Sequence, residues 1–403
     1  MTANIAEQIK TLRRGTVEIF TEPELAERLA EAQKAGRQLR VKLGLDPTSP
    51  DIHLGHTVVL RKMRQFQDLG HKAVLIIGDY TARIGDPTGQ NTTRPMLSPQ
   101  QIEKNAQTYF KQAGKILDTS PERLEVRHNS EWLEKMTLME LIQLAAKKTI
   151  AQMLQRDSFK ERMKNDIDVF AHEFIYPLMQ GYDSVIVKSD IELGGTDQTF
   201  NNLVGRDIQK AYGQKPQVVL TTPILTGLDG KEKMSKSKGN YIGVTDEPND
   251  MFGKVMSISD DMMENYFTLL TDLPAEKIAE LTNPQKTHPK QAKVLLGKTI
   301  VAQFYDAQTA DSAADNFEKV FAQKQLPDDI LEVEISPSPC SVAKVLLQTK
   351  LVSSSGEAKR MIKQASTSVD GVKVLDPNEQ ITPKNGMVIQ VGKRKFAKIK
   401  IKN

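Results

Sequence analysis

The fold is decided by the stretch Asp46-Pro47-Thr48-Ser49-Pro50-Asp51-Ile52-His53-Leu54-Gly55-His56. A short apolar run over residues 41–45 comes before it and is typical of a buried strand. Apolar residues then recur at helical spacing from Val58 to Leu69, and Gly70 follows as a helix C-cap. The stretch therefore joins a strand to a helix N-terminus, where free backbone N–H groups and the helix dipole favour phosphate.

Two histidines, His53 and His56, flank Leu54-Gly55 at this helix start. Gly55 lets a ligand approach the backbone closely, and the imidazoles can donate hydrogen bonds to phosphate oxygens. A helix start with two surface histidines explains the same pattern equally well. A metal site is disfavoured because no third ligand stands nearby in the sequence.

A second informative stretch lies far downstream, at Gly230-Lys231-Glu232-Lys233-Met234-Ser235-Lys236-Ser237-Lys238-Gly239-Asn240. Its composition is that of a mobile basic loop, which by itself is also typical of a solvated surface. Together, His53-Leu54-Gly55-His56 and Lys233-Met234-Ser235-Lys236-Ser237 resemble the HIGH and KMSKS signatures of class I aminoacyl-tRNA synthetases.

Four further stretches are similar to those of bacterial tyrosyl-tRNA synthetases, and the resemblance runs through essentially the whole chain. They are Gly44-Leu45-Asp46-Pro47-Thr48, Ile84-Gly85-Asp86-Pro87, Tyr176-Pro177-Leu178-Met179-Gln180-Gly181-Tyr182-Asp183 and Gly194-Gly195-Thr196-Asp197-Gln198. The resemblance implies that L-tyrosine is activated with ATP to tyrosyl-adenylate, releasing pyrophosphate, and is then transferred to the 3′ end of tRNA(Tyr). It also implies Mg²⁺ accompanying the ATP, without a dedicated protein metal site.

Bulk properties are those of a cytoplasmic globular protein. The 403 residues contain a single cysteine, Cys340, so no intramolecular disulfide can form. No apolar run has the length of a membrane span or a signal peptide. Charge is uneven, because residues 336–403 hold 13 Lys and Arg against 4 Asp and Glu, whereas the net charge of the whole chain is only +4. A basic C-terminal module predicts a polyanionic partner at that end.

Alternating strands and helices predict an α/β fold with a Rossmann-like, doubly wound parallel sheet. We expect strands near residues 40–45, 72–78, 124–128, 191–195 and 217–221. We place the catalytic domain at 1–240, with a helical insertion at about 130–165, and expect helices throughout 241–331. A linker at 332–340 and a small α+β domain at 341–403 follow. In the resembling family the insertion contributes to a homodimer interface and the helical domain approaches the anticodon.

The first reaction step needs in-line positioning and neutralisation of charge on the phosphates. Thr48, His53 and His56 are suited to contact ATP phosphates from the helix start, and Lys233 and Lys236 can close over them. The resemblance assigns further ATP contacts to Gly55, Gly195, Asp197, Met234, Ser235 and Ser237.

For the amino acid, the resemblance assigns Asp86, Tyr176 and Gln180 to the α-ammonium group and Asp183 to the phenolic hydroxyl. Gly44, Asp46 and Gln198 complete the implied tyrosine site. The resemblance puts Asp46 near the α-amino group or the sugar, and Gln198 near the amino-acid carboxylate or the adenylate. One position departs from the pattern, because many family members have a tyrosine where this chain has Lys42. Lys42 is either a donor to the substrate hydroxyl or a solvated lysine at the end of a strand, and Asp79 or Tyr80 could fill the space instead.

The C-terminal region from Ser354 to Ile362, followed by Val369-Asp370-Gly371, resembles the S4 RNA-binding module. That resemblance points to Lys359, Arg360 and Lys363 as phosphate contacts. Lys393, Arg394 and Lys395 form a second basic cluster.

Three other functions remain open at this point. A tryptophanyl-tRNA synthetase would share the reaction, but Asp183 and the S4-like tail disfavour it. An RNA-binding protein with an inactive synthetase domain would not need both intact signatures. A nucleotidyltransferase of the same superfamily that makes a small cofactor would not need the basic module.

Overall fold

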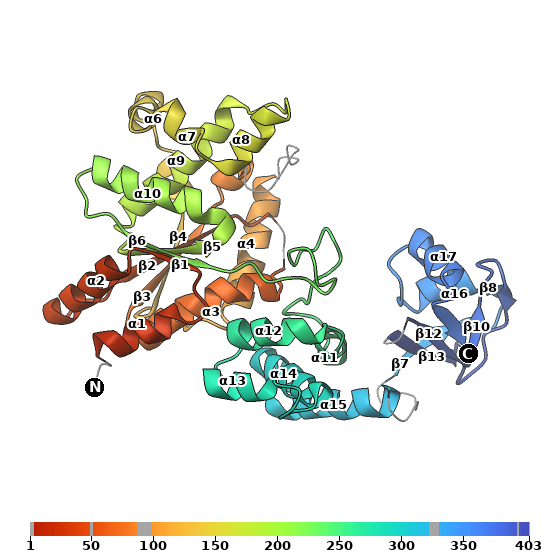
Figure 1. Ribbon diagram of the computed structural model, residues 1–403. Helices are drawn as coiled ribbons and strands as arrows, with labels where there is room; N and C mark the ends of the chain where they lie inside the picture. Colours follow the sequence, from red (N-terminus) through yellow and green to blue (C-terminus); the bar gives the residue numbers. More distant parts are fainter. Residues whose placement is uncertain (1–3, 49–50, 87–97, 322–329, 393–394, 403) are drawn as a thin grey trace. The chain divides into compact units, whose positions relative to one another are not determined.

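The computed structural model describes residues 4–48, 51–86, 98–321, 330–392 and 395–402 (Figure 1). The chain packs as two compact units. One comprises Met1–Asp246 and Ser257–Phe304, and the other Glu247–Met256 and Tyr305–Asn403. Within the described residues, no helix is both long enough and apolar enough to cross a membrane.

A six-stranded sheet forms the centre of the first unit. Its strand order is β1-β6-β5-β2-β3-β4, and all neighbours are parallel except β1, which pairs antiparallel with β6. The strands are β1 (Glu18–Phe20), β2 (Arg40–Leu45), β3 (Lys72–Ile77), β4 (Leu124–His128), β5 (Ile191–Gly195) and β6 (Val218–Thr222). The predicted doubly wound parallel sheet is confirmed, and only the short edge strand β1 was not expected.

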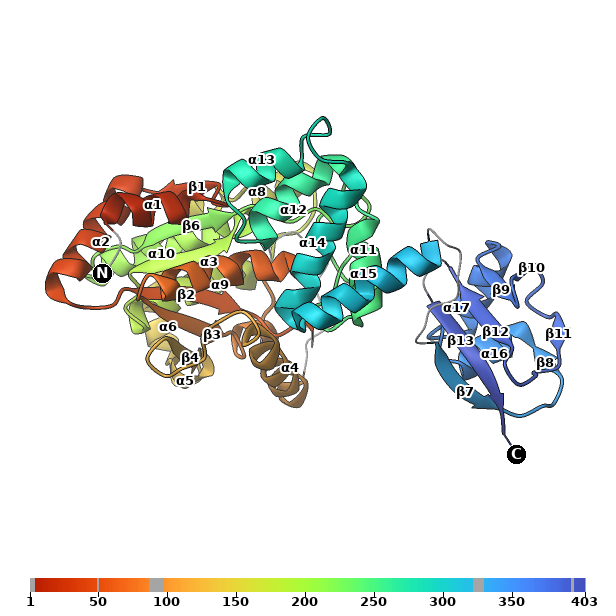
Figure 2. The same cartoon turned by 90° about the horizontal axis from the view of Figure 1, so that it is seen from below.

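Successive strands are added to the sheet in opposite directions on the two sides of the β2–β5 pair. From β2 it passes through α3 (Leu54–Asp68) to β3, whereas β5 leads through α10 (Thr199–Ala211) to β6 on the other side. Right-handed crossovers in opposite directions place the two helices on opposite faces of the sheet, as Figures 1 and 2 show. The carboxyl ends of β2 and β5 therefore border the crevice where such folds bind ligands.

Close packing of α9 (Ala171–Ile186) on α10 depends on two glycines. A Cβ added at Gly181 would lie 3.3 Å from the Cα of Gly205, so the helix backbones approach nearly as closely as they can. On the side of α9 that faces the sheet, Gln180 and Ser184 reach Lys42 of β2 and Glu192 of β5.

Local capping signals explain where several helices begin. The spacing of Thr21 and Glu24, and that of Ser98 and Gln101, is typical of a capping box. Both boxes form in the structure, at the starts of α2 (Glu22–Ala35) and α4 (Pro99–Ala113). The insertion folds as predicted into short helices, α5 (Ser130–Leu133), α6 (Leu138–Ala145), α7 (Ile150–Met153) and α8 (Asp157–Lys164). Helix α1 (Ile5–Arg13) precedes β1.

Residues 248–321 are mostly helical, as expected, but their helices are divided between the two compact units. The first-unit helices are α12 (Met263–Leu270), α13 (Ala275–Leu281) and α14 (Pro289–Phe304), and α12 packs on α3. Helices α11 (Pro248–Met256) and α15 (Ala307–Phe321) belong to the second unit, where the rings of Phe252 and Phe317 lie 5.6 Å apart.

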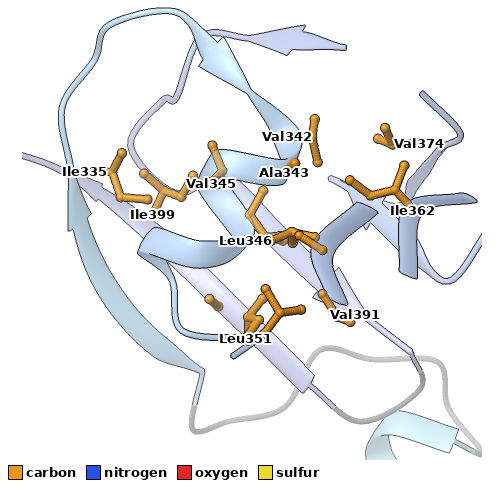
Figure 3. Packing of buried hydrophobic residues seen from close by; sticks show 14 residues of the cluster. Ile335, Val342, Ala343, Val345, Leu346, Leu351, Ile362, Val374, Val391 and Ile399 are labelled. Carbon is orange, nitrogen blue, oxygen red and sulfur yellow. The ribbon is translucent and has the colours of Figure 1, made fainter. Parts of the chain in front are cut away.

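A five-stranded sheet ends the chain, in the order β10-β9-β12-β13-β7. Its strands are β7 (Leu331–Ile335), β9 (Thr367–Val369), β10 (Val372–Val374), β12 (Val388–Val391) and β13 (Lys395–Ile401), and β8 (Cys340–Ser341) pairs with β11 (Gln380–Ile381). Helices α16 (Val342–Gln348) and α17 (Ser355–Lys363) contribute to one apolar core with the sheet (Figure 3).

Strand β7 corrects the prediction of a linker beginning at residue 332. Residues 331–335 pair in parallel with β13, and Ile335 is buried in the core that Figure 3 shows. The strand was missed because its alternation of apolar and acidic residues is short and its partner lies more than 60 residues later.

Candidate active site

The turn after β2 presents both histidines as hydrogen-bond donors. His53 is the N-cap of α3, and its Nδ1 accepts from the backbone N–H of Gly55 at 3.1 Å. The Nδ1 of His56 accepts from the backbone N–H of His53 at 3.2 Å. Because Nδ1 is the acceptor in each neutral ring, the proton resides on Nε2. Each imidazole thus has an Nε2–H group for a further acceptor.

Burial keeps these rings uncharged. It lowers the pKa of His53 to about 2 and that of His56 to about 4, and the neighbouring lysines Lys233 and Lys236 add to both effects. Around pH 7 the histidines therefore act as neutral hydrogen-bond donors, and the positive charge at this end of the site belongs to the lysines.

The segment that directly follows the lysine loop (residues 230–240) is joined to this turn by backbone hydrogen bonds. The N–H of Leu54 donates to the carbonyl of Ile242 at 2.9 Å, and the N–H of Val244 donates to that of Ile52 at 3.1 Å. The loop itself is held by Asn240, whose Oδ1 accepts from the N–H of Ser235 at 2.8 Å. Two signatures about 180 residues apart in the sequence therefore meet beyond the carboxyl ends of the strands.

Both signature lysines pair with partly exposed carboxylates. The Nζ of Lys233 lies 3.7 Å from Asp197, and the Nζ of Lys236 lies 3.4 Å from Asp51. Such half-exposed pairs contribute little to stability. A polyphosphate can therefore replace the carboxylates at small cost.

Helix α9 supplies one wall of the site. Tyr176, Gln180 and Asp183 follow each other at intervals of four and three residues, so they share one helix face. The Tyr176 hydroxyl donates to Asp46 at 2.8 Å, and Thr81 donates to the same carboxylate at 2.8 Å. Burial nevertheless raises the pKa of Asp46 to about 7, with Asp86 and Asp183 adding to the rise.

Asp183, the last of these three residues, is buried. It accepts from the Trp132 indole N–H at 2.8 Å and from Asn129 at 3.4 Å. Burial raises its pKa to about 7, against the lowering effects of Lys42, Trp132 and Asn129. Asp86 instead accepts from Gln198 at 2.7 Å and lies 3.5 Å from the guanidinium of Arg156.

One cavity of about 390 Å³ connects the two ends. It is lined by sixteen of the eighteen site residues predicted for catalysis, ATP and tyrosine, namely Gly44, Asp46, Thr48, His53, Gly55, His56, Asp86, Tyr176, Gln180, Asp183, Gly195, Asp197, Gln198, Lys233, Met234 and Ser235. The other two, Lys236 and Ser237, lie in the lysine loop outside this lining, where Ser237 Oγ is 2.8 Å from Ser235 Oγ.

The sequence matches family models over nearly its whole length. Residues 33–322 match the model "tRNA synthetases class I (W and Y)" and residues 322–399 match the C-terminal domain of SYY-like tyrosine–tRNA ligases. A tyrosine–tRNA ligase of Cupriavidus pinatubonensis is 51% identical over 99% of this chain and 96% of its own length. The chain belongs to the tyrosine–tRNA ligase family.

Other members agree with this assignment. The tyrosine–tRNA ligase of Bordetella avium is 50% identical over 100% of this chain and 98% of its own length. The fold matches the tyrosyl-tRNA synthetase of Archaeoglobus fulgidus, solved with L-tyrosine, with a TM-score of 0.62, 24% identity, and coverage of 76% of this chain and 99% of that chain.

Lys42, the residue at which this family member departs from the expected tyrosine, is buried. Lys42 has 0% of its surface exposed, so the interpretation as a solvated lysine is wrong. Its Nζ donates to Glu192 at 2.9 Å, to Ser184 at 2.7 Å and to the carbonyl of Gln180 at 2.9 Å. The two suggested alternatives, Asp79 and Tyr80, are not among the residues that line the cavity, and the Asp79 carboxylate accepts from the N–H and hydroxyl of Ser130.

Several residues of this family member's site were not found from the sequence. Thr81, Asn129 and Trp132 contact Asp46 or Asp183, and Arg156 contacts Asp86. The first three lie just after the carboxyl ends of β3 and β4. That position is a usable signal in a parallel sheet, whereas Arg156 comes from the insertion and had none.

The predicted RNA-binding residues that the structure describes are exposed. Lys359, Arg360 and Lys363 project from α17, and Lys395 begins β13, while Lys393 and Arg394 lie outside the described residues. Lys395 and Arg360 both act electrostatically on Glu357, so the two basic groups are neighbours. Lys398, in contrast, lies 3.6 Å from Glu332 across the β7–β13 pair.

Proposed function

We propose that this chain is a tyrosine–tRNA ligase that forms tyrosyl-adenylate from L-tyrosine and ATP and then esterifies tRNA(Tyr). The observation that carries the proposal is the single cavity. At one end of the cavity lie a helix start suited to phosphate and the lysine loop. At the other end lie the carboxylates of Asp46 and Asp86 and the buried acceptor Asp183. Membership of the family supports the same reaction.

In the first step, a carboxylate oxygen of tyrosine attacks the α-phosphorus of ATP, and the bond between that phosphorus and the bridging oxygen to the β-phosphorus breaks. The Nε2–H groups of His53 and His56 donate to phosphate oxygens as charge develops, as does the Thr48 hydroxyl. Lys233 and Lys236 leave Asp197 and Asp51 and neutralise the departing pyrophosphate. Mg²⁺ bound together with ATP would supply further neutralisation of the phosphate charge.

Asp197 is then free to accept from a ribose hydroxyl, beside the backbone of Gly195. A Cβ at Gly195 would lie 2.7 Å from Asp197 Oδ1, so only glycine leaves room there. Gly55 and the loop residues Met234, Ser235 and Ser237 complete the nucleotide contacts.

The other end of the cavity holds the amino acid. Asp86, Tyr176 and Gln180 bind the α-ammonium group, with Gly44, Asp46 and Gln198 beside it, and Asp183 accepts from the phenolic hydroxyl. The carboxylates of Asp46 and Asp86 make the ammonium end of the pocket suitable for a cation. A buried acceptor left unpaired by phenylalanine makes the pocket selective for tyrosine.

In the second step, the 3′-terminal hydroxyl of tRNA(Tyr) attacks the tyrosyl carbonyl and AMP leaves. The basic groups of α17 and Lys395, together with Lys393 and Arg394, contact the RNA backbone. This role in protein synthesis places the enzyme in the cytoplasm.

Pyrophosphate–ATP exchange, with each amino acid added in turn, tests the activity. Exchange with tyrosine alone is expected. Exchange with tryptophan would keep the reaction and overturn the pocket assignment, whereas no exchange with any amino acid would overturn the enzyme assignment.

The helical insertion is the proposed contact between two copies of the chain. It exposes large apolar side chains close together in sequence, with exposed fractions of 73% for Leu138, 62% for Met139, 53% for Ile142 and 64% for Ile150. Apolar patches of this kind mark association surfaces. Light scattering should give a dimer for the wild type and a monomer for Leu138→Glu/Ile142→Glu. A monomeric wild type would overturn the proposal.

A further inference from the structure

A buried ion pair lies under the amino-acid end of the cavity. Lys42 on β2 and Glu192 on β5 are register partners, and 0% and 1% of their surfaces are exposed. Removing two charges from water costs free energy that a salt bridge often does not recover, so apolar residues of the same size would be as stable there or more so. Nothing in the two reaction steps uses either residue. The pair therefore calls for a role other than stability.

All the donors of Lys42 are already used. Its ammonium has three N–H groups, and its three acceptors are Glu192, Ser184 and the carbonyl of Gln180. It cannot donate to a substrate hydroxyl without losing one of them. Direct recognition of the phenol by Lys42 is therefore disfavoured.

The Gln180 side chain is oriented by this pair. Its amide nitrogen donates to Glu192 Oε1 at 3.2 Å and to Asn202 Oδ1 at 2.9 Å, which uses both of its N–H groups. Among the described residues, no hydrogen bond reaches the amide oxygen, and Gln180 lines the cavity. A rotation of the amide by 180° would bring that oxygen against the Glu192 carboxylate, which repels it.

We propose that Lys42 and Glu192 are positioning residues that fix the Gln180 amide with its oxygen toward the α-ammonium group of the substrate. The Lys42 ammonium donates to Glu192 at 2.9 Å, and the Glu192 carboxylate accepts only from the nitrogen side of the Gln180 amide. The inference rests on the proposed contact between Gln180 and the α-ammonium group. It makes recognition at that end of tyrosine depend on two residues that do not touch it.

The test compares two inhibitors of tyrosine-dependent pyrophosphate exchange. Tyramine keeps the ammonium group and lacks the carboxylate, whereas 3-(4-hydroxyphenyl)propionate keeps the carboxylate and lacks the ammonium group. In the uncharged variant Lys42→Met/Glu192→Gln, the amide at 192 can accept or donate, so only Asn202 still favours one orientation of the Gln180 amide. The inhibition constant of tyramine should rise about tenfold, the effect of one weakened hydrogen bond to a charged group, while that of the propionate stays unchanged.

An equal rise for both inhibitors, or no rise for tyramine, would overturn the proposal. Asn202→Ala is a second variant that leaves the ion pair intact and removes the other acceptor of the Gln180 amide, so it keeps the question open to test if the double variant does not fold. It should give a smaller rise confined to tyramine, and an unchanged or unselective response would count against the proposal.

Gln180→Ala separates this inference from the assignment on which it rests. If Gln180→Ala leaves tyramine inhibition unchanged, the proposed contact between Gln180 and the ammonium group fails. If Gln180→Ala weakens tyramine and Lys42→Met/Glu192→Gln does not, only the positioning role fails. Exchange at saturating tyrosine and the KM for ATP should stay near wild type in the double variant.

Discussion

Two carboxylates in the tyrosine pocket have pKa values near neutral pH because they are buried. Burial raises the pKa of both Asp46 and Asp183 to about 7, whereas it lowers the pKa values of His53 and His56 to about 2 and about 4. The two ends of the cavity therefore respond differently to acid. Below pH 7 the tyrosine end loses negative charge, while the histidines stay neutral.

This difference predicts a pH profile. As pH falls from 8 to 6, Asp46 gains a proton and attracts the ammonium group less, and a protonated Asp183 accepts less well from the phenolic hydroxyl. Both changes should raise the KM for tyrosine. The KM for ATP should change little, because the histidines do not titrate in that range. Initial rates of pyrophosphate exchange measure both. A KM for tyrosine that stays level over this range would contradict the assigned pKa values, and Asp183→Asn should flatten part of the response.

Gly78 lies where a side chain would displace a site carboxylate. An added Cβ would overlap Asp46 and lie 2.5 Å from the Thr81 hydroxyl, which donates to Asp46. Gly78→Ala should therefore raise the KM for tyrosine about tenfold or more, since one hydrogen bond to a charged group is broken. Gly356→Ala is the control, because its Cβ meets nothing closer than 3.9 Å. Wild-type kinetics in Gly78→Ala would show that Asp46 is not needed in this position.

At the scale of elements, the lysine loop is expected to act on the transition state. Lys233→Ala and Lys236→Ala should each slow adenylate formation about 100-fold, because each removes a charge that neutralises the leaving pyrophosphate. Equilibrium binding of tyrosine should be unchanged. Lys231→Ala is the matched control, being an exposed lysine of the same loop outside the cavity lining. Rapid-quench rates that match the wild type would remove the loop from the mechanism.

The RNA-binding role of exposed lysines on α17 can be tested against a paired lysine on β13. Lys359, Arg360 and Lys363 are exposed on α17, whereas Lys398 on β13 faces Glu332. Lys359→Ala/Lys363→Ala should raise the KM for tRNA and reduce its salt dependence, since two phosphate contacts are lost. Lys398→Ala should do neither, and exchange should be normal in both variants. A similar effect of the two variants on charging would argue for nonspecific attraction.

For the whole molecule, the C-terminal sheet should be separable from activation. Because β7 belongs to that sheet, the chain must be cut before residue 330 rather than after Leu331. A chain ending at residue 321 should form tyrosyl-adenylate at the normal rate and charge tRNA poorly. Exchange and aminoacylation assays on the same preparation measure both. Undiminished charging would exclude an RNA role for residues 330–403.

Patterns among residues close together in the sequence predicted most of the fold. Caps such as Thr21 and Ser98, the apolar run of β2 and the helical spacing of α3 involve neighbours in the sequence, so they predicted the elements and the parallel sheet directly. The two signatures and the α9 face, from Tyr176 to Asp183, also placed most of the cavity lining, because residues at the carboxyl ends of parallel strands converge.

Contacts between distant residues were decided only by the tertiary structure. The burial of Lys42 depends on Glu192, which lies 150 residues away, and β7 becomes a strand only because β13 pairs with it. The partners of Asp183 and the raised pKa values depend on which side chains surround a group after folding. The sequence alone determined which elements form and which chemistry is present. The tertiary structure decided the charge and orientation of each group, because these depend on burial and on partners that sequence spacing does not reveal.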